Sequence, residues 1–322
     1  RKAILQLMVD IRKLRIAYLS TGNIPSFHTH NIQTMKMSEG LFDVASEFCL
    51  LTSSTHLKNE EQSKFIHNWY GTKAFPITFI PSEEETSQGM FSCFSANGFI
   101  ENSIPFLKEW KPDIIMTRDI LGAYHYLKEK FNVVIESHIR HTHEYFQYLN
   151  FFQKYDQLLS VVTLCQHLRL AYTHEGISPN LLQVLPHGVD DNFEGFHSKS
   201  SLGIPNNRFI VTYTGHLYER KGIDLILRTA QLLPEVSFYI LGGANSDQLF
   251  WKYCNQYLNN NNVHFLGMIE PKKIPSYLNA SDVLLLPNKT NDAEAGISCP
   301  LKLFEYMQAK KPIICSETKY LK

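Results

Sequence analysis

Residues 281–316 read SDVLLLPNKTNDAEAGISCPLKLFEYMQAKKPIICS, and this stretch decides the fold class. It begins with a short apolar run, Val283–Leu286, of the kind found in strands that are buried on both faces. Pro300 suits the first turn of a helix, where its missing N–H costs no hydrogen bond. The run Pro312–Cys315 then predicts the next buried strand. The stretch therefore predicts a strand, a loop, a helix and a second strand, which together form one unit of an α/β sheet.

The loop before this predicted helix is a candidate phosphate site. With Pro300 in the first turn, Ser298 or Cys299 would cap the helix, and the backbone N–H groups up to Leu301 would be unpaired. Such N–H groups and the helix dipole attract phosphate. Glu305 lies further along the same helix and can accept two hydrogen bonds from a ribose diol, as acidic residues do in dinucleotide folds. A phosphate site beside a diol acceptor predicts a nucleotide ligand.

The segment PLKLFEYM at 300–307 resembles the donor-binding signature of the family 4 retaining glycosyltransferases. That family has the GT-B fold, in which two Rossmann-like domains face each other across a cleft. Many members carry a second glutamate eight residues before the ribose-binding one, where this chain has Ile297. A subgroup with the same signature also lacks that glutamate. The resemblance implies a nucleotide sugar as donor and Glu305 as the residue that holds its ribose.

Length and composition restrict the class of protein. The 322 residues, 44% of them hydrophobic, are enough for two domains of about 150 residues each. Lys+Arg and Asp+Glu both number 31, so no global charge favours nucleic acid. The six cysteines lack metal-like spacing and indicate a reduced, cytoplasmic environment. No run reaches the roughly 18 apolar residues of a membrane span. The basic amphipathic segment Arg1–Leu14 leaves peripheral membrane contact as an alternative.

Strands and helices alternate through the first half of the chain, which predicts parallel βαβ units. The predicted strand Leu14–Leu19 is followed by a turn that contains Gly22, at the sheet edge where ligands bind. The predicted strand Val133–Ile135 leads into Glu136-Ser-His138 in the same way. In family 4 a histidine after this strand contacts the donor sugar, so the resemblance implies a catalytic role for His138. A structural histidine that caps the next segment is the alternative.

A domain boundary is predicted at 192/193, which gives an N-terminal domain of residues 1–192 and a C-terminal domain of 193–322. The phrase PHGVD at 186–190 resembles the one that closes the first domain in family 4, and the polar segment 197–207 follows it. Family members continue beyond the strand at Pro312–Cys315, so the second domain is expected to be incomplete.

The second half repeats the pattern of strand, glycine turn and helix. After the predicted strand Phe209–Thr214, Gly215 opens a loop in which Arg220 and Lys221 could neutralise a diphosphate. This loop resembles the family's "Gly-Arg-Leu…Lys-Gly", with His216 in place of the arginine. The sequence therefore predicts a second set of contacts to the donor.

Two further loops complete the predicted donor site. Gly243 follows the predicted strand Val236–Leu241 and would let a ligand approach the backbone. By resemblance, Met268 and Ile269 would flank the nucleobase. His138, His141 and His143 lie close in sequence, but no cysteine or carboxylate frame accompanies them, so no metal and no other cofactor is expected.

These features predict a retaining hexosyltransferase of family 4 type that moves a sugar from a nucleotide-diphosphate donor to a glycan or lipid-linked acceptor in polysaccharide biosynthesis. Lys221, Arg220 and the N–H groups of 298–301 would stabilise charge on the departing diphosphate. The protein is expected in the cytoplasm, or at the inner face of the membrane if its acceptor is lipid-linked. Two alternatives remain: a nucleotide-sugar epimerase, which would need acid–base carboxylates in the cleft, and a nucleotide-sugar-binding protein without turnover, suggested by Ile297 and His216.

Overall fold

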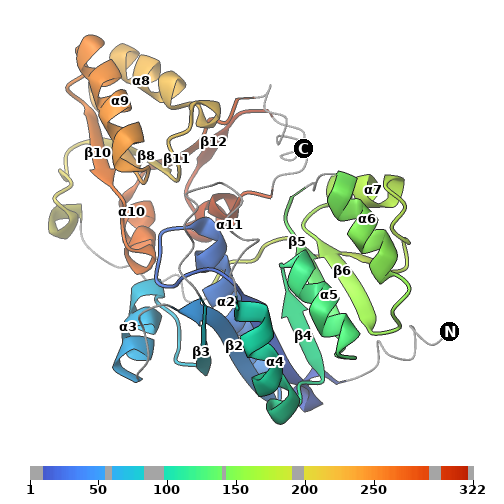
Figure 1. The fold of residues 1–322 in the computed structure, drawn as a ribbon. Helices are drawn as coiled ribbons and strands as arrows, with labels where there is room; N and C mark the ends of the chain where they lie inside the picture. Colours follow the sequence, from blue (N-terminus) through green and yellow to red (C-terminus); the bar gives the residue numbers. More distant parts are fainter. Residues whose placement is uncertain are drawn as a thin grey trace. The chain divides into compact units, whose positions relative to one another are not determined.

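A computed structural model describes residues 10–54, 60–82, 98–139, 143–190, 199–289 and 299–317 of the chain. Contacts between Cα atoms divide it into two units, Arg1–Leu185 and Pro186–Lys322 (Figure 1). This division falls seven residues before the predicted boundary at 192/193, just ahead of the PHGVD segment. Each unit contains one parallel sheet with helices packed on it.

The first unit is built on a seven-stranded parallel sheet in the order β3-β2-β1-β4-β5-β6-β7. Its strands are β1 (Arg15–Ser20), β2 (Glu47–Ser54), β3 (Ile77–Pro81), β4 (Ile114–Thr117), β5 (Val133–Ser137), β6 (Leu158–Thr163) and β7 (Leu182–Val184). The chain adds strands on one side of β1 as far as β3 and then crosses to the other side with β4. The crevice at such a reversal, outside the carboxyl ends of the strands, is where open α/β sheets bind ligands.

The helices of the first unit supply the rest of its core. They are η1 (Ile11–Lys13), α2 (Thr29–Val44), α3 (Glu60–Tyr70), α4 (Phe99–Trp110), α5 (Ile120–Lys128), α6 (His143–Phe152) and α7 (Gln166–His174). One core cluster joins Tyr18 of β1 and Leu50 of β2 to Met35 of α2 and Tyr70 of α3, and all four are fully buried. Helix α2 also buries the polar residues Asn31, Gln33 and Thr34 in its first turns. The interior of the unit is therefore polar at this place.

The second unit repeats the plan with a five-stranded parallel sheet in the order β10-β9-β8-β11-β12. Its strands are β8 (Phe209–Thr214), β9 (Val236–Leu241), β10 (Val263–Gly267), β11 (Val283–Leu286) and β12 (Ile313–Cys315). Its helices are η3 (Lys199–Leu202), η4 (Glu219–Lys221), α8 (Ile223–Leu232), α9 (Asn245–Tyr257), η5 (Pro271–Lys273), α10 (Ile274–Ala280) and α11 (Leu301–Gln308). Here the order reverses at β8, so the ligand-binding edge lies where β8 and β11 end.

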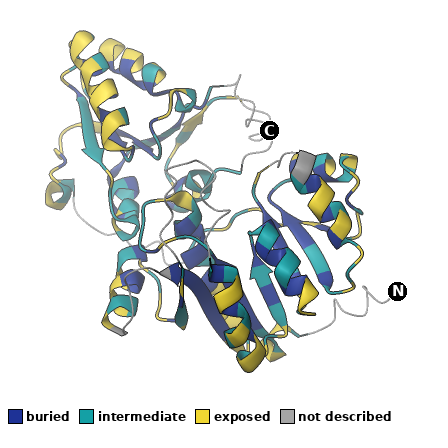
Figure 2. Cartoon of the chain, viewed as in Figure 1, coloured by how far each residue is buried: buried dark blue, intermediate teal, exposed yellow. Residues whose placement is uncertain are grey.

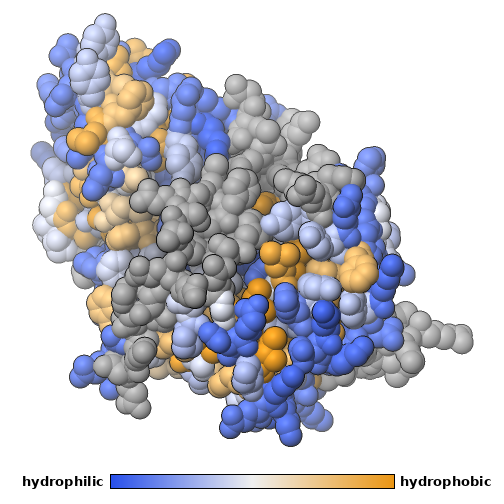
Figure 3. Space-filling view, in the orientation of Figure 1, coloured by the Kyte–Doolittle hydropathy of each residue, from blue (hydrophilic) through white to orange (hydrophobic). Residues whose placement is uncertain are grey.

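Strands and helices differ in how far their residues are exposed to solvent. Buried residues gather on the strands, whereas α9 is exposed along much of its length (Figure 2). Hydrophobic residues reach the surface around α8 and α9 (Figure 3), where the most exposed on α9 are Leu249, Phe250, Tyr253 and Tyr257. Within the described part of the chain, no helix has both the length and the apolar character needed to cross a membrane.

Candidate functional site

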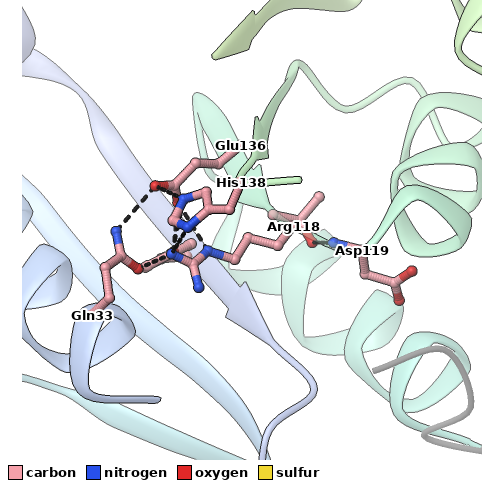
Figure 4. A network of polar contacts seen from close by, with 7 residues as sticks. Gln33, Arg118, Asp119, Glu136 and His138 are labelled. Atoms are coloured by element: carbon pink, nitrogen blue, oxygen red, sulfur yellow. Dashed lines mark hydrogen bonds and ion pairs between the residues drawn. The ribbon is translucent and has the colours of Figure 1, made fainter. Parts of the chain in front are cut away.

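A buried polar cluster lies at the carboxyl ends of the central strands of the first unit (Figure 4). Its centre is the carboxylate of Glu136, on β5, which is only 3% exposed. The carboxylate accepts hydrogen bonds from Tyr18 Oη at 2.8 Å, from Gln33 Nε2 at 3.0 Å and from His138 Nε2 at 2.6 Å. Arg118 Nε lies 3.3 Å from Oε2, the oxygen that also accepts from Tyr18. Four elements therefore converge on one buried charge.

His138 lies between the charges of Glu136 and Arg118. Its Nε2 lies 2.6 Å from Oε1 of Glu136, and a carboxylate can only accept a hydrogen bond. Nη2 of Arg118 lies 3.0 Å from Nδ1 and 2.9 Å from Nε2, so the guanidinium faces both ring nitrogens. Arg118 also contacts the Gln33 amide oxygen. The cluster thus pairs one arginine with one carboxylate and holds the histidine between them.

Charges and burial shift the pKa values in the directions that this arrangement requires. Burial alone would raise the pKa of Glu136, but Arg118, His138 and Tyr18 together hold it well below its usual value. Burial and the charge of Arg118 lower the pKa of His138, and Glu136 opposes them only in part. Burial raises the pKa of the Tyr18 hydroxyl well above its usual range, so Tyr18 remains a hydrogen-bond donor. Asp119, which follows Arg118, points away from the cluster and caps α5 (Figure 4).

The loop after β1 is anchored beside this cluster. Thr52 Oγ1 donates to the carbonyl of Gly22 at 2.8 Å, and Ser53 Oγ donates to that of Thr21 at 2.7 Å. A side chain at Gly22 would collide with those of His30 and Asn31 on α2. Close packing of the loop on α2 therefore accounts for the glycine, and Gly22 remains a predicted ligand contact.

Acid is expected to destabilise the first unit through His30. Burial, and next to it the charge of Arg118, lowers the pKa of His30 to about 4. Between pH 6.5 and 4 the unfolded chain therefore binds a proton that the folded chain refuses, so stability falls as the pH is lowered. At pH 5 the loss attributable to His30 is at most about 2 kcal/mol.

Denaturant unfolding of His30→Gln and of the unaltered protein, measured from pH 7 to pH 4, checks this expectation. The variant should show a shallower fall in the free energy of unfolding below pH 6.5. Equal slopes for the two proteins would contradict the assignment to His30.

The second unit has its own cluster at the end of β8, where its sheet reverses direction. Gly215, directly after β8, has a φ of 131° and donates its N–H to the Leu241 carbonyl at 2.9 Å. The Cβ atom of any side chain at position 215 would lie 2.8 Å from Nζ of Lys302. Lys302 belongs to the first turn of α11. That Nζ lies 4.0 Å from the centre of the Tyr213 ring. Strand β8 and helix α11 thus meet at a lysine that the sequence did not single out.

Helix α11 is attached firmly to β8. Tyr306, which is fully buried, accepts a hydrogen bond from the Thr214 N–H at 2.9 Å. The helix begins at Leu301, and Pro300 is its N-cap, with an extended backbone and no capping hydrogen bond from its side chain. The predicted cap at Cys299 and the predicted first-turn position of Pro300 are therefore wrong by one residue. The other predicted cap, Ser298, lies outside the described residues.

The predicted cation loop folds as the short helix η4. Lys221 and Glu305 lie close enough to Lys302 for the charge of each to act on the Lys302 amine. The guanidinium of Arg220 stacks 5.1 Å from the centre of the Tyr218 ring, and the His216 ring is stacked on the same tyrosine at 5.0 Å. The charges of Lys221 and Glu305 thus reach Lys302, whereas Arg220 and His216 are held against Tyr218.

The glycines around this loop are explained by packing. Gly222 has a φ of 75°, and a side chain there would strike the carbonyl of Pro287, at the end of β11. At Gly243 the corresponding space is filled by Leu217. Its contact with Leu217 gives a structural reason for the glycine, and close approach of a ligand to Gly243 stays a prediction.

The remaining predicted donor contacts lie at other places on the second unit. Met268 is 37% exposed in the loop after β10, and Ile269 packs beside the core cluster that contains Tyr239. Leu301 and Cys299, at the start of α11, are partly buried. Three residues that sequence reasoning missed are Arg118, Glu136 as the centre of a cluster, and Lys302.

Only part of the histidine group that was considered as a metal site lies within the described residues. His141 and the side chain of His143 lie outside the described residues. Among the residues that are described, no three histidine, cysteine, aspartate or glutamate side chains gather in a way that could hold a metal ion.

Comparisons with known proteins agree with this architecture. Residues 196–322 match the family described as Glycosyl transferases group 1. A segment of 120 residues is 27% identical to the alpha-galactosylglucosyldiacylglycerol synthase of Streptococcus pneumoniae and covers 36% of this chain and 30% of that protein. Another of 107 residues is 27% identical to the putative teichuronic acid biosynthesis glycosyltransferase TuaH of Bacillus subtilis and covers 33% of this chain and 26% of that protein. The chain thus matches less than a third of the length of either relative.

Solved structures resemble nearly the whole chain. HepE of Anabaena, in complex with UDP and glucose, has a TM-score of 0.70 at 16% identity, over 96% of this chain and 82% of HepE. Sucrose-phosphate synthase of Thermosynechococcus elongatus has a TM-score of 0.71 at 17% identity, over 96% of this chain and 83% of the synthase. The fold is GT-B, with two Rossmann-like parallel sheets, as the sequence predicted.

Proposed function

We propose that this chain, whose second unit carries a glycosyl transferases group 1 domain on a GT-B fold, transfers a sugar from a nucleotide-diphosphate donor. The observation that carries the proposal is the cluster at the reversal point of the second sheet. Lys302, in the first turn of α11, lies there against Gly215, and Lys221 and Glu305 are near enough for their charges to act on its amine. Cations and helix N–H groups suit a diphosphate, and a nearby carboxylate suits a ribose diol.

The finer assignments belong to the same proposal. Lys221 stabilises negative charge on the departing diphosphate, a preorganised electrostatic role. Glu305 holds the ribose. The donor is a uridine nucleotide sugar, and UDP-glucose is the first candidate, because HepE was solved with UDP-glucose. The sugar keeps its anomeric configuration, as in family 4, and the leaving phosphate accepts the proton of the attacking hydroxyl.

His138 is proposed to act through its fixed position and not by transferring a proton. Both of its ring nitrogens are engaged within the cluster, Nε2 by Glu136 and both nitrogens by Nη2 of Arg118. An imidazole held in this way is poorly suited to exchange protons during the reaction. The cluster therefore serves as a rigid support for His138.

The acceptor is proposed to be a glycan or a lipid-linked sugar. The curated relatives that match the chain are named for a glycolipid synthase and for teichuronic acid biosynthesis. A lipid-linked acceptor would bring the protein to a membrane surface. Cosedimentation with vesicles that carry the acceptor tests this part of the proposal separately.

The function is tested with a panel of UDP-, GDP- and ADP-sugars, each supplied with and without diacylglycerol glycolipid or oligosaccharide acceptors. We expect acceptor-dependent release of UDP and a product whose anomeric proton shows retained configuration. Conversion of the donor sugar without any acceptor would identify an epimerase. Donor binding without release of nucleotide would identify a binding protein, and the absence of binding to every donor would overturn the proposal.

A further inference from the structure

A buried amine without a hydrogen bond lies inside the proposed donor site. Lys302 as a residue is partly buried, but its Nζ atom is out of contact with solvent, and none of the described residues gives it a hydrogen bond. The amine lies on the face of Tyr213 and against the backbone of Gly215. Buried polar groups are almost always hydrogen-bonded, so this exception requires an explanation.

The surroundings of Lys302 oppose a permanent positive charge. Burial lowers the pKa of its amine well below the usual value, the charge of Lys221 on η4 lowers it further, and Glu305, on the same helix, raises it only in part. Tyr213 on β8 offers the face of its ring, which gives modest support to a cation. Without an added negative charge the amine therefore loses its proton far more readily than an exposed lysine does.

We propose that Lys302 is a further ligand of the donor diphosphate, and that its amine takes up a proton from solvent when the diphosphate binds. This inference rests on the proposed function of the same site. A diphosphate would bring the negative charge that the amine lacks, and an opposite charge within a few ångströms favours the protonated form of a lysine. The bound state would then contain two lysine cations, Lys302 and Lys221, opposite one diphosphate.

Three observations favour a ligand role over a packing role. Lys302 lies in the first turn of α11, whose N-cap residue Pro300 gives the helix no side-chain cap. Gly215 leaves beside Nζ a space that a side chain would fill. A lysine that served only to cover the Tyr213 ring could be replaced by an apolar side chain of similar length, which would not leave a buried amine unsatisfied.

Titration calorimetry at pH 8, where the second ionisation of a phosphate group is complete, tests the proposal. UDP, GDP and ADP are first compared on the unaltered protein, and the tightest is measured in HEPES and in Tris, whose heats of ionisation differ. The measurement is repeated on Lys302→Met and on Lys252→Met, which removes an exposed lysine from α9. The matching nucleoside, which has no phosphate, is the second ligand.

We expect the unaltered protein and Lys252→Met to take up a fraction of a proton, more than zero and less than one, for each diphosphate that binds. Lys302→Met should lose this uptake and bind the diphosphate about 10- to 100-fold more weakly, the range for hydrogen bonds to charged groups. Nucleoside binding should not change. The thermal midpoint of ligand-free Lys302→Met should equal or exceed that of the unaltered protein, since a functional residue is often held at a cost in stability.

The possible failures can be told apart. If the unaltered protein binds no nucleoside diphosphate, the proposed function falls. If it binds one, and Lys302→Met binds it equally tightly with the same proton uptake, the inference about Lys302 is wrong and the proposed function stands. Lys302→Gln replaces Lys302→Met if the latter does not fold, with the same expected loss of uptake and affinity.

Discussion

Replacement of Arg118 by methionine is expected to lower the free energy of unfolding of the first unit by about 3–5 kcal/mol, the usual effect of removing one partner of a buried ion pair. Glu136 would keep its charge in a nearly dry environment, with only Tyr18, Gln33 and His138 as hydrogen-bond donors. The alternative for the carboxylate is to take up a proton, which also costs free energy at neutral pH. Either route destabilises the fold around β5.

Native-state hydrogen exchange measures this loss of stability separately in each unit. Peptides from β1 and β5 report on the first unit, whereas those from β8 and β9 report on the second and should not change. Arg12→Met is the matched control, because Arg12 is 79% exposed at its side chain and pairs with Asp10 at the surface. Such a surface pair contributes at most about 1 kcal/mol.

A second substitution separates charge from packing. If the cost of Arg118→Met comes from an uncompensated carboxylate, the additional change Glu136→Gln should recover a large part of the lost stability, because a neutral amide needs no cation. A double variant as unstable as the sum of the two single variants would show that the charge pair is not the cause. An effect of Arg118→Met no larger than that of Arg12→Met would show that the pair contributes little.

The sequence predicted the sheets well because their strands are short apolar runs between polar or turn residues. The bounds of β8, β9 and β11 are those expected from Phe209–Thr214, Val236–Leu241 and Val283–Leu286. Helix α6, at His143–Phe152, was not predicted, although Thr142, a residue type favoured at helix N-caps, directly precedes it in the sequence. The start of α11 was displaced by one residue, because the helix begins at Leu301 and Pro300 is its N-cap.

The sites were only partly predictable, because their residues meet through topology. Tyr18 and Glu136 are 118 positions apart, and nothing local in the sequence connects them. The strand order brings β1 and β4 together and places β5 next to β4, so the cluster appears only once the sheet is assembled. Lys302 did leave a signal, because a lysine inside the otherwise mostly apolar segment PLKLFEYM is unexpected for a helix that packs on a sheet. A resemblance that highlighted Glu305 drew attention away from it.

Loss of Lys221 is expected to have the largest effect on activity, with kcat/KM for transfer lowered about 10²–10³-fold in Lys221→Met. The proposed role of this lysine is to stabilise charge that develops as the diphosphate leaves. An interaction that strengthens in the transition state affects kcat, whereas one that is equal in the ground and transition states affects KM. Most of the loss should therefore fall on kcat.

Glu305→Gln is expected to change a different kinetic constant from Lys221→Met. A carboxylate that holds a ribose does so equally before and during the reaction, so its loss should raise KM for the donor and weaken nucleoside binding, with kcat little changed. Steady-state kinetics on both variants, with Lys252→Met as the control for a lost surface lysine, distinguish the two roles. If Lys221→Met changed only KM, Lys221 would bind the donor without acting on the transition state. If neither variant differed from the control, the donor would not lie at the end of β8.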